Sequence, residues 1–420
     1  MDKLESEFTV IGAGMVGVCC ALYLQKEGFK VSLVDKGAPG EAASFGNLGI
    51  IGIGSCPPLA LPGILRQVPG MLLDPGAPLK FRWRDFPGTL PWLLRLLPES
   101  RRERVEEIAS RRQSLLSKVH EALDPLVSES GANDLMRKTG LLITFESDAA
   151  FENASYALDL RRRNGVEIEV LDGDETRQFE PSLSASVVRS WRIPELVHVR
   201  DPGALVKKFA GLFAARGGTI RKGEITGFAM GARGVEALRT RDGPIEVGNV
   251  VLAAGAWSRK LAKLLGSSLP LVAERGYHTV FLDAEPNIRV PIISSERKLA
   301  VTPMSNGVRA GGFSEFANPD APPDMRHAQR ARQHAEAMFP ELRSARHSEW
   351  MGPRPAFPDS IPVIGRSPRC RNAWFAFGHD HIGLTLGAIT GRLISEMAAG
   401  KPTTVDISPF APGRFRGLRI

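Results

Sequence analysis

Short apolar runs and one helical stretch alternate at the N-terminus, and their order predicts a βαβ unit. Residues 8–11 form a β-branched and aromatic run that is typical of a buried strand. A glycine turn over 12–17 follows directly, and residues 18–27 carry a helical pattern. A second apolar run over 29–34 ends in Asp35. Strand, glycine turn, helix, strand and acid in this order are typical of a unit that binds a dinucleotide.

Three glycines and one carboxylate in this unit have separate physical roles. Gly12 allows the tight turn, Gly14 lets the backbone approach a pyrophosphate, and Gly17 lets the helix pack on the strand. The N–H groups at the start of the helix face the phosphates. Asp35 can accept hydrogen bonds from ribose hydroxyls, and an acid at this position argues against NADP. The unit alone does not distinguish NAD from FAD.

The rest of the chain does not continue this alternation, which indicates a second domain. A Pro-rich apolar stretch over 57–98 precedes a capping box at 100–103 that predicts the start of a helix. Strands are expected at 141–145 and within 278–310, and a further helix at 203–216.

Composition limits the classes of partner and the compartment. A chain of 420 residues predicts two or three domains. Its net charge of +8 is spread along the chain, which suits an anionic ligand or membrane surface and argues against nucleic acid. The sequence shows neither a signal-peptide pattern nor 18 uninterrupted apolar residues. We therefore expect a cytoplasmic protein, either free or on the inner face of the cell membrane.

Four cysteines occur, and none of them forms a CxxC pair. This usage favours a reducing compartment. Cys19 and Cys20 are adjacent on the first helix, point about 100° apart, and are predicted to be small core residues rather than a redox pair.

The segment from Ala43 to Asn47, with Gly49, resembles the turn after the second strand in the D-amino-acid oxidase/dehydrogenase superfamily of FAD enzymes. Three further segments resemble the same family in the same order, at 250–257, 350–365 and 378–387. The resemblance extends from residue 8 to about 397. Residues 274–278 and 406–412 look most like bacterial D-amino-acid dehydrogenases, and glyphosate-oxidising and hydroxyproline dehydrogenases are similar there.

The resemblance implies a mixed fold, α/β together with α+β. A Rossmann-like FAD-binding domain would comprise residues 1–56, 196–268 and 350–420. A discontinuous substrate domain built on an antiparallel sheet would comprise residues 57–195 and 269–349. We expect non-covalent FAD, because the surroundings of the cysteines give no sign of a flavin attachment.

The resemblance and the βαβ unit together give the expected cofactor-binding residues. They are Gly12, Gly14, Met15, Val16, Gly17, Asp35, Lys36, Ala43, Ser44, Asn47, Gly49, Ile225, Ala254, Gly255, Trp257, Gly378, His379, Gly383, Leu384 and Thr385.

Arg354 is the first candidate for catalysis, because the family binds the substrate carboxylate at this position and a guanidinium can hold it bidentately. The alternative is a structural salt bridge. Tyr277 is the second candidate, to share the carboxylate or border the flavin, or else to be an ordinary strand aromatic. If Tyr277 faces the site, His278 does not. His379 is the third, beside a helix start that can stabilise negative charge on the flavin, or else a local cap.

One departure from the family affects the set of side chains that would hold the substrate carboxylate, called the clamp below. Some relatives carry a carboxylate-binding Tyr in the strand where Ala300 stands here. The clamp therefore rests on Arg354 alone or recruits Tyr277 or Arg309. The His379-Asp380-His381 triplet lacks further ligands nearby, so no metal is expected.

The function predicted from the resemblance is FAD-dependent oxidation of an amino-acid C–N bond by hydride transfer to flavin N5. The substrate would be a D-amino acid or related secondary amine, the imine would hydrolyse, and a quinone or O2 would accept the electrons. Alternatives are a secondary-amine oxidase for N-substituted glycines of glyphosate type, an NAD-dependent dehydrogenase, and a non-catalytic flavin-binding subunit. The stretch 57–98 is interpreted either as a peripheral membrane contact or as a lid over the site.

Overall fold

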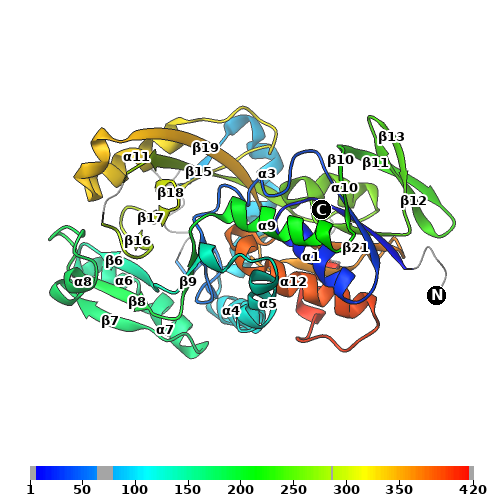
Figure 1. The fold of residues 1–420 in the computed structure, drawn as a ribbon. Coiled ribbons are helices and arrows are strands. Elements are labelled where there is room, and N and C mark those ends of the chain that lie inside the picture. The colour runs from blue at the N-terminus through cyan, green and yellow to red at the C-terminus, as the bar shows by residue number, and fades with distance from the viewer. Residues whose placement is uncertain (1–5, 64–78, 285–286, 416–420) are drawn as a thin grey trace.

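A parallel sheet forms one half of the computed structural model, which describes residues 6–63, 79–284 and 287–415. Its order is β10-β2-β1-β14-β21-β20, and only β20 is antiparallel to its neighbour. The strands are β1 (Glu7–Ile11), β2 (Lys30–Asp35), β10 (Thr219–Lys222), β14 (Asn249–Leu252), β20 (Val363–Arg366) and β21 (Ala373–Phe377). Figure 1 shows this sheet on the side of the molecule that carries the N-terminus.

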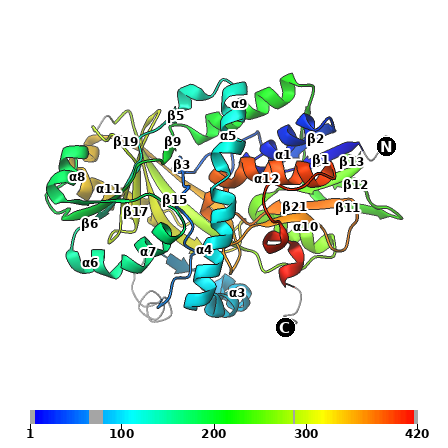
Figure 2. The same cartoon turned by 90° about the horizontal axis from the view of Figure 1, so that it is seen from below.

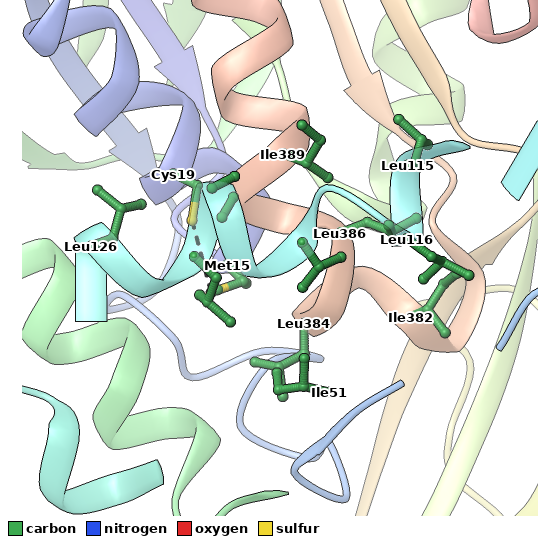
Figure 3. Close-up of a cluster of buried hydrophobic side chains, with 14 of the residues drawn as sticks. Met15, Cys19, Ile51, Leu115, Leu116, Leu126, Ile382, Leu384, Leu386 and Ile389 are labelled. Carbon is green, nitrogen blue, oxygen red and sulfur yellow. Dashed lines mark hydrogen bonds between the residues drawn. The ribbon is translucent and has the colours of Figure 1, made fainter. Parts of the chain in front are cut away.

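Two helices cross closely against this sheet, α1 (Met15–Lys26) and α12 (Gly383–Ala398). Glycines on α12 permit the contact, because a Cβ at Gly391 would lie 2.5 Å from the backbone of Cys19. Cys19 and Cys20 are fully buried, which confirms their prediction as core residues. Figure 3 shows apolar side chains of α1 and α12 meeting those of α4 (Arg102–Leu116) and α5 (Val119–Glu129).

A larger mixed sheet forms the other half (Figures 1 and 2). Its order is β19-β15-β18-β17-β16-β6-β8-β7, and β4 pairs with β18. The strands are β4 (Leu79–Phe81), β6 (Leu141–Phe145), β7 (Glu169–Asp172), β8 (Arg189–Ile193), β15 (Val272–Leu282), β16 (Ile292–Ser294), β17 (Leu299–Met304), β18 (Gly307–Phe316) and β19 (Arg346–Ala356). Helix α11 (Arg326–Met338) packs on β15 and β18.

Smaller elements complete the described chain. Two three-stranded sheets contain β3 (Ile50–Ile51), β9 (Val197–Val199) and β5 (Met136–Arg137), and β11 (Ile225–Gly231), β12 (Gly234–Thr240) and β13 (Gly243–Glu246). The remaining α-helices are α3 (Phe86–Glu99), α6 (Asp148–Asn153), α7 (Ser155–Arg163), α8 (Gly173–Phe179), α9 (Pro202–Ala215) and α10 (Ser258–Leu264).

Two features bear on the expected domain limits, which stay a prediction. Strand β19 runs across the limit expected between residues 349 and 350. Helices α4 and α5 come from the 57–195 segment but pack on α12.

The predicted capping box before α4 is wrong. The N-cap of α4 is Arg101, with no side-chain hydrogen bond, because the Ser100 hydroxyl donates instead to the Leu97 carbonyl at the end of α3. The predicted helix at 203–216 is confirmed as α9, where the Asp201 side chain accepts a hydrogen bond from the Ala204 N–H at 2.9 Å.

The antiparallel pair of β15 and β19 positions the site residues. Its register sets Glu274 opposite Arg354, and His278 opposite Trp350. Successive side chains on a strand point to opposite faces, so Glu274, Gly276 and His278 share one face of β15. Tyr277 and Thr279 lie on the other face, which is covered by α11. The Thr279 hydroxyl donates a hydrogen bond to the Ala328 carbonyl of that helix.

Candidate active site

A cavity of about 550 Å³ is lined by residues of both halves of the molecule. Its wall includes the glycine turn, the loop that follows β2, the end of β14, the inner face of β15 and β19, and the start of α12. Most residues of the predicted cofactor set line this cavity, which brings together residues as far apart in the chain as Gly12 and Leu384.

The glycine turn is built so tightly that side chains would not fit. Gly12 has a φ of +111°, and a Cβ there would lie 2.3 Å from the Ala253 carbonyl oxygen. A Cβ at Gly17 would lie 1.8 Å from the Gly12 carbonyl oxygen. The roles predicted for Gly12 as the turn residue and Gly17 as the helix–strand contact follow from these distances.

Polar groups around the turn match the chemistry of a dinucleotide. The Asp35 carboxylate closes the β2 end, accepting from the Ala13 N–H at 2.6 Å and the Gly37 N–H at 2.8 Å. The Ser44 hydroxyl accepts from the Met15 N–H at 3.0 Å, so it stands directly over the start of α1. A helix start with a hydroxyl suits a pyrophosphate, and a carboxylate after β2 suits a ribose. The residues present therefore fit FAD.

A cation and an aromatic ring mark the end of the cavity beside Asp35. The Lys36 ammonium lies 3.6 Å from the centre of the Trp257 ring. The Trp257 indole N–H donates to Asp320 at 2.8 Å, and Ile225 also lines this end. Asp320 was not predicted, because no local motif marks it.

The loop after β2 is held by a buried arginine from β18. Arg309 Nη1 donates to the carbonyl oxygens of Phe45 at 2.8 Å and Asn47 at 2.5 Å. Burial lowers the pKa of Arg309 to about 10, so the group stays charged at neutral pH. The Asn47 side chain in turn accepts from the Gly49 N–H at 2.9 Å. Arg309 thus positions the predicted flavin-contacting loop.

Arg354 lies in the cavity wall on β19. Its Nη1 donates to Glu274 Oε1 at 3.2 Å, and its side chain is 26% exposed, so other donors remain open to the cavity. The absence of a side chain at Gly276 makes room for it, since a Cβ there would lie 2.2 Å from Arg354 Nη2. The Trp350 and His278 rings stack at 5.0 Å on the same face. This arrangement can hold a carboxylate against a planar guanidinium.

Tyr277 points to the opposite face of β15. Its hydroxyl donates to Glu315 at 2.9 Å and accepts from Arg275 at 2.7 Å, and its ring packs beside His327 of α11. Tyr277 and His278 both belong to the cavity wall, but the His278 side chain lies on the inner face, with Nδ1 3.1 Å from the Gly46 carbonyl oxygen. The structure therefore gives Tyr277 a place in a buried polar cluster, and its predicted catalytic role remains untested.

The start of α12 borders the cavity through Gly383 and Leu384. Thr385 accepts from the Gly52 N–H at 2.9 Å and so links this helix to the loop after β2. His379 Nε2 lies 2.9 Å from Thr390 Oγ1, and burial lowers the pKa of His379 to about 3. His379 is therefore neutral at pH 7 and holds the approach to α12.

Asp380 and Arg112 form a buried pair behind this turn, with 3.7 Å between Arg112 Nη1 and Asp380 Oδ2. Burial raises the pKa of Asp380 to about 8, although Arg112 opposes the shift. Arg112 also donates to the carbonyl oxygens of Ser55 and Ser360. Within the described ranges, no group of three or more His, Cys, Asp or Glu side chains is arranged to hold a metal ion.

Sequence reasoning missed Gly276, Trp350 and His381 as parts of the cavity wall, and Glu274 as the partner of Arg354. A usable signal existed for Trp350, because it lies four residues before Arg354 on one strand and so shares its face. The roles of Glu274 and Gly276 depend on which strand pairs with β19, and this pairing is not visible in the sequence.

Replacing Gly276 by alanine is expected to lower kcat/KM about tenfold or more, mainly by raising KM. The new Cβ would displace the Arg354 guanidinium rather than the backbone, so the fold and the FAD content should be retained. Steady-state kinetics and the visible flavin spectrum measure the two effects. Gly227→Ala on β11, with 3.8 Å to its nearest atom, is the matched control and should change neither.

Comparison with known proteins gives the family from the sequence and a matching fold from a solved structure. The family model for FAD dependent oxidoreductases matches residues 7–397. A D-amino-acid oxidase of Bradyrhizobium diazoefficiens is 38% identical, covering 97% of this chain and 98% of that protein. A D-amino acid dehydrogenase of Paramagnetospirillum magneticum is 31% identical, covering 97% and 98%. Glycine oxidase from Geobacillus kaustophilus superposes with a TM-score of 0.76 at 21% identity, covering 98% and 99%.

Proposed function

Because the chain belongs to the FAD-dependent oxidoreductase family, we propose that it oxidises the C–N bond of a D-amino acid. The observation that carries this proposal is the position of Arg354 in the cavity wall. Its guanidinium occupies the space that the missing side chain of Gly276 leaves, and some of its N–H donors are open to the cavity. FAD is the cofactor of the family, and when bound it supplies a hydride acceptor at N5 of its ring.

Different stretches of the cavity wall suit different parts of FAD, and the residues that would hold each part can be named from their chemistry. The glycine turn and Ser44 serve the pyrophosphate, and Asp35 serves the ribose. Lys36 and Trp257 lie at the adenine end, whereas the loop held by Arg309 and the start of α12 serve the flavin. The N–H groups of α12 offer positive charge to the ring.

The charge near the expected substrate position depends on two histidines and on the pair of Arg354 and Glu274. Burial lowers the pKa of His278 and of His381 to about 3, so both are neutral at pH 7. His381 faces the cavity, and the cations Arg112 and Arg354 lower its pKa further. Arg354, partly balanced by Glu274, is then the charge that orients a substrate carboxylate.

Anaerobic bleaching of the flavin by a panel of D-, L- and N-substituted amino acids tests this function. We expect D-amino acids to bleach the flavin and release ammonia. Release of a substituted amine or of glycine would instead identify the secondary-amine reaction on N-substituted glycines. A flavin that no amine bleaches would refute the proposal and leave a non-catalytic subunit.

We also propose that FAD is held without a covalent bond. Cys56 and Cys370 are both buried, and burial raises the pKa of the Cys56 thiol, which disfavours its reactive thiolate. Precipitation with acid should leave the flavin in the supernatant. Flavin that remains with the precipitated chain would contradict this.

The electron acceptor, a quinone or O2, determines whether the protein works at a membrane. Helix α3 is anchored by Trp92, whose indole N–H donates to the Ala356 carbonyl at 3.1 Å, and it exposes Leu90, Leu94 and Leu97. Trp83, 67% exposed, precedes it. In the part of the chain that the structure describes, no helix has the length and apolarity to span a bilayer. Residues 64–78 of the predicted membrane contact or lid lie outside that part.

We propose that α3 contacts the inner face of the cytoplasmic membrane, because exposed leucines beside Arg84 and Arg101 suit an anionic interface. Sedimentation with anionic liposomes should carry the protein down at low salt. Leu94→Ser should reduce this binding. Protein that stays in solution at both low and high salt would refute the membrane contact and favour the lid.

A further inference from the structure

A hydrogen bond at one end of the cavity joins the two halves of the molecule. Trp257 follows β14 of the parallel sheet, and its indole N–H donates at 2.8 Å to Asp320, in the loop that follows β18 of the large sheet. Both residues belong to the cavity wall, and the Lys36 ammonium lies 3.6 Å from the centre of the same ring. The roles given above to the glycine turn and to Arg354 do not involve Asp320.

The loop that carries Asp320 comprises residues 317–325, between β18 and α11, and it is restrained along its length. Three of its nine residues are prolines, which reduce the number of backbone conformations open to the chain. The Asn318 N–H donates to Asp85 Oδ2 at 3.2 Å, directly before α3. The Asp320 N–H donates to the Asn318 side chain at 3.0 Å. These contacts limit where the Asp320 carboxylate can lie.

A buried polar cluster holds the other side of this loop. The Arg275 guanidinium is fully buried and donates to the Ala321 carbonyl at 2.6 Å and to Glu315 Oε2 at 2.8 Å. The Tyr277 hydroxyl accepts from the Asp324 N–H at 3.1 Å. A buried ion pair lowers the free energy of the fold only when further hydrogen bonds satisfy its groups, and here the backbone of the loop supplies them.

The loop therefore bears on the end of the cavity where the adenine of FAD is expected. Asp35 and Lys36 follow β2 at the position that suits the adenosine ribose, and Trp257 lies beside Lys36. An indole ring offers a large flat surface to an aromatic ligand. A side chain that is already fixed loses less conformational entropy when the ligand binds, so a hydrogen bond that fixes the ring favours the bound state.

We propose that Asp320 holds the Trp257 ring at the adenine end of the cavity and thereby slows the loss of FAD. Through the 317–325 loop, the half of the molecule built on the large sheet contributes to cofactor binding. Arg275 and Tyr277 are positioning residues that act through this loop. The inference requires FAD in the cavity, but it does not depend on which amine is oxidised.

Dissociation of FAD from the holoenzyme, followed by flavin fluorescence after dilution, tests the hydrogen bond. Asp320→Ala should raise the dissociation rate about 5- to 20-fold, the range for one hydrogen bond to a charged group. Asp320→Asn keeps an oxygen that can accept from the indole and should retain FAD better than Asp320→Ala. Asp324→Ala is the matched control, because it removes a carboxylate of the same loop that pairs with Arg326, and its rate should stay within about twofold of the unaltered enzyme.

A double-mutant cycle shows whether Asp320 acts through Trp257. Trp257→Phe keeps an aromatic ring but removes the N–H donor, and it should also raise the dissociation rate. The double variant should lose FAD no faster than the faster of the two single variants, because both remove the same bond. Increases that multiply in the double variant would show that the two residues act independently, and would overturn the proposal.

Tyr277→Phe tests the support that the buried cluster gives to the loop. It removes the acceptor of the Asp324 N–H and should raise the FAD dissociation rate about 3- to 5-fold, but not further in the Asp320→Ala background. Thr279→Val is the matched control, because Thr279 is fully buried on the same face of β15 and its hydroxyl donates to α11 instead of the loop. Its dissociation rate should stay within about twofold of the unaltered enzyme.

The outcomes separate this inference from the proposed function. An unchanged dissociation rate in Asp320→Ala, or an equal increase in Asp324→Ala, would overturn the role of Asp320 and leave amino-acid oxidation intact. An equal increase in Thr279→Val would overturn the role of the cluster. Slower flavin reduction by substrate in Tyr277→Phe, with FAD fully retained, would place Tyr277 at the substrate instead. FAD dissociation can be measured even if no amine bleaches the flavin, so the proposed function can fail by itself.

Discussion

Arg354→Leu is expected to lower kcat/KM by at least about 100-fold, about 2.7 kcal/mol of transition-state binding, while FAD stays bound. The guanidinium is planar and already positioned by Glu274 at 3.2 Å, so it can present two parallel N–H groups to a carboxylate. Leucine retains the apolar stem but offers no donor. Stopped-flow flavin reduction and steady-state kinetics measure the loss, and the visible spectrum measures FAD content.

Two controls separate binding from structural damage. Arg354→Lys keeps the positive charge but cannot present two parallel N–H groups, so it should be more active than Arg354→Leu and less active than the unaltered enzyme. Arg346→Leu lies on the same strand, where Arg346 pairs with Asp283 at the exposed end, and it should behave like the unaltered enzyme. Unchanged kinetics in Arg354→Leu would show that the arginine is structural. A fall in thermal stability that matches the activity loss would show that the unpaired Glu274 disrupts the strand pair.

The glycine turn was predictable because its physics is local. Gly12, Gly14 and Gly17 follow β1 at fixed spacing, and the tight turn and the close contact can be inferred from that spacing alone. Asp35 belongs to the same unit, and its bond to the Ala13 N–H spans only 22 residues. The mixed α/β class and the family were equally accessible, since four motifs in order identify them.

The faces of β15 were not predictable in the same way. Tyr277 and His278 are neighbours that both line the cavity, but only one of the two side chains can point into it. Helix α11 determines which side chain points into the cavity, because it covers the face of β15 that carries Arg275, Tyr277 and Thr279. Nothing near 277 in the sequence reveals which helix packs there.

Contacts between distant residues explain the other omissions. Arg309 reaches the Phe45 carbonyl across 264 positions, and Arg161 reaches Gly54 across 107. An isolated arginine carries no local pattern that distinguishes a loop support from a ligand. The capping-box prediction was wrong for a related reason. The Ser100 hydroxyl can bond either to backbone at the start of α4 or to backbone at the end of α3, and in the structure it donates to the Leu97 carbonyl of α3.

Gly17→Ala is expected to destabilise the protein by about 3 kcal/mol and to abolish most FAD binding. A Cβ at this position would lie 1.8 Å from the Gly12 carbonyl oxygen, so either α1 or the turn must move. The turn is itself fixed against the Ala253 carbonyl, which leaves little room for relaxation. Urea unfolding measures the stability, and flavin absorbance per chain measures the occupancy.

Gly211→Ala is the matched control for this substitution. Gly211 is also a helical glycine, on α9, but it is exposed and a Cβ there meets no atom within 4 Å. Alanine is favoured over glycine in a helix by up to about 1 kcal/mol, so Gly211→Ala should stabilise the protein slightly and leave FAD in place. The opposite signs of the two changes separate helix propensity from the close contact. If Gly17→Ala were as stable as Gly211→Ala, the approach of α1 to the turn would have to be looser than the structure shows, and FAD binding would not depend on it.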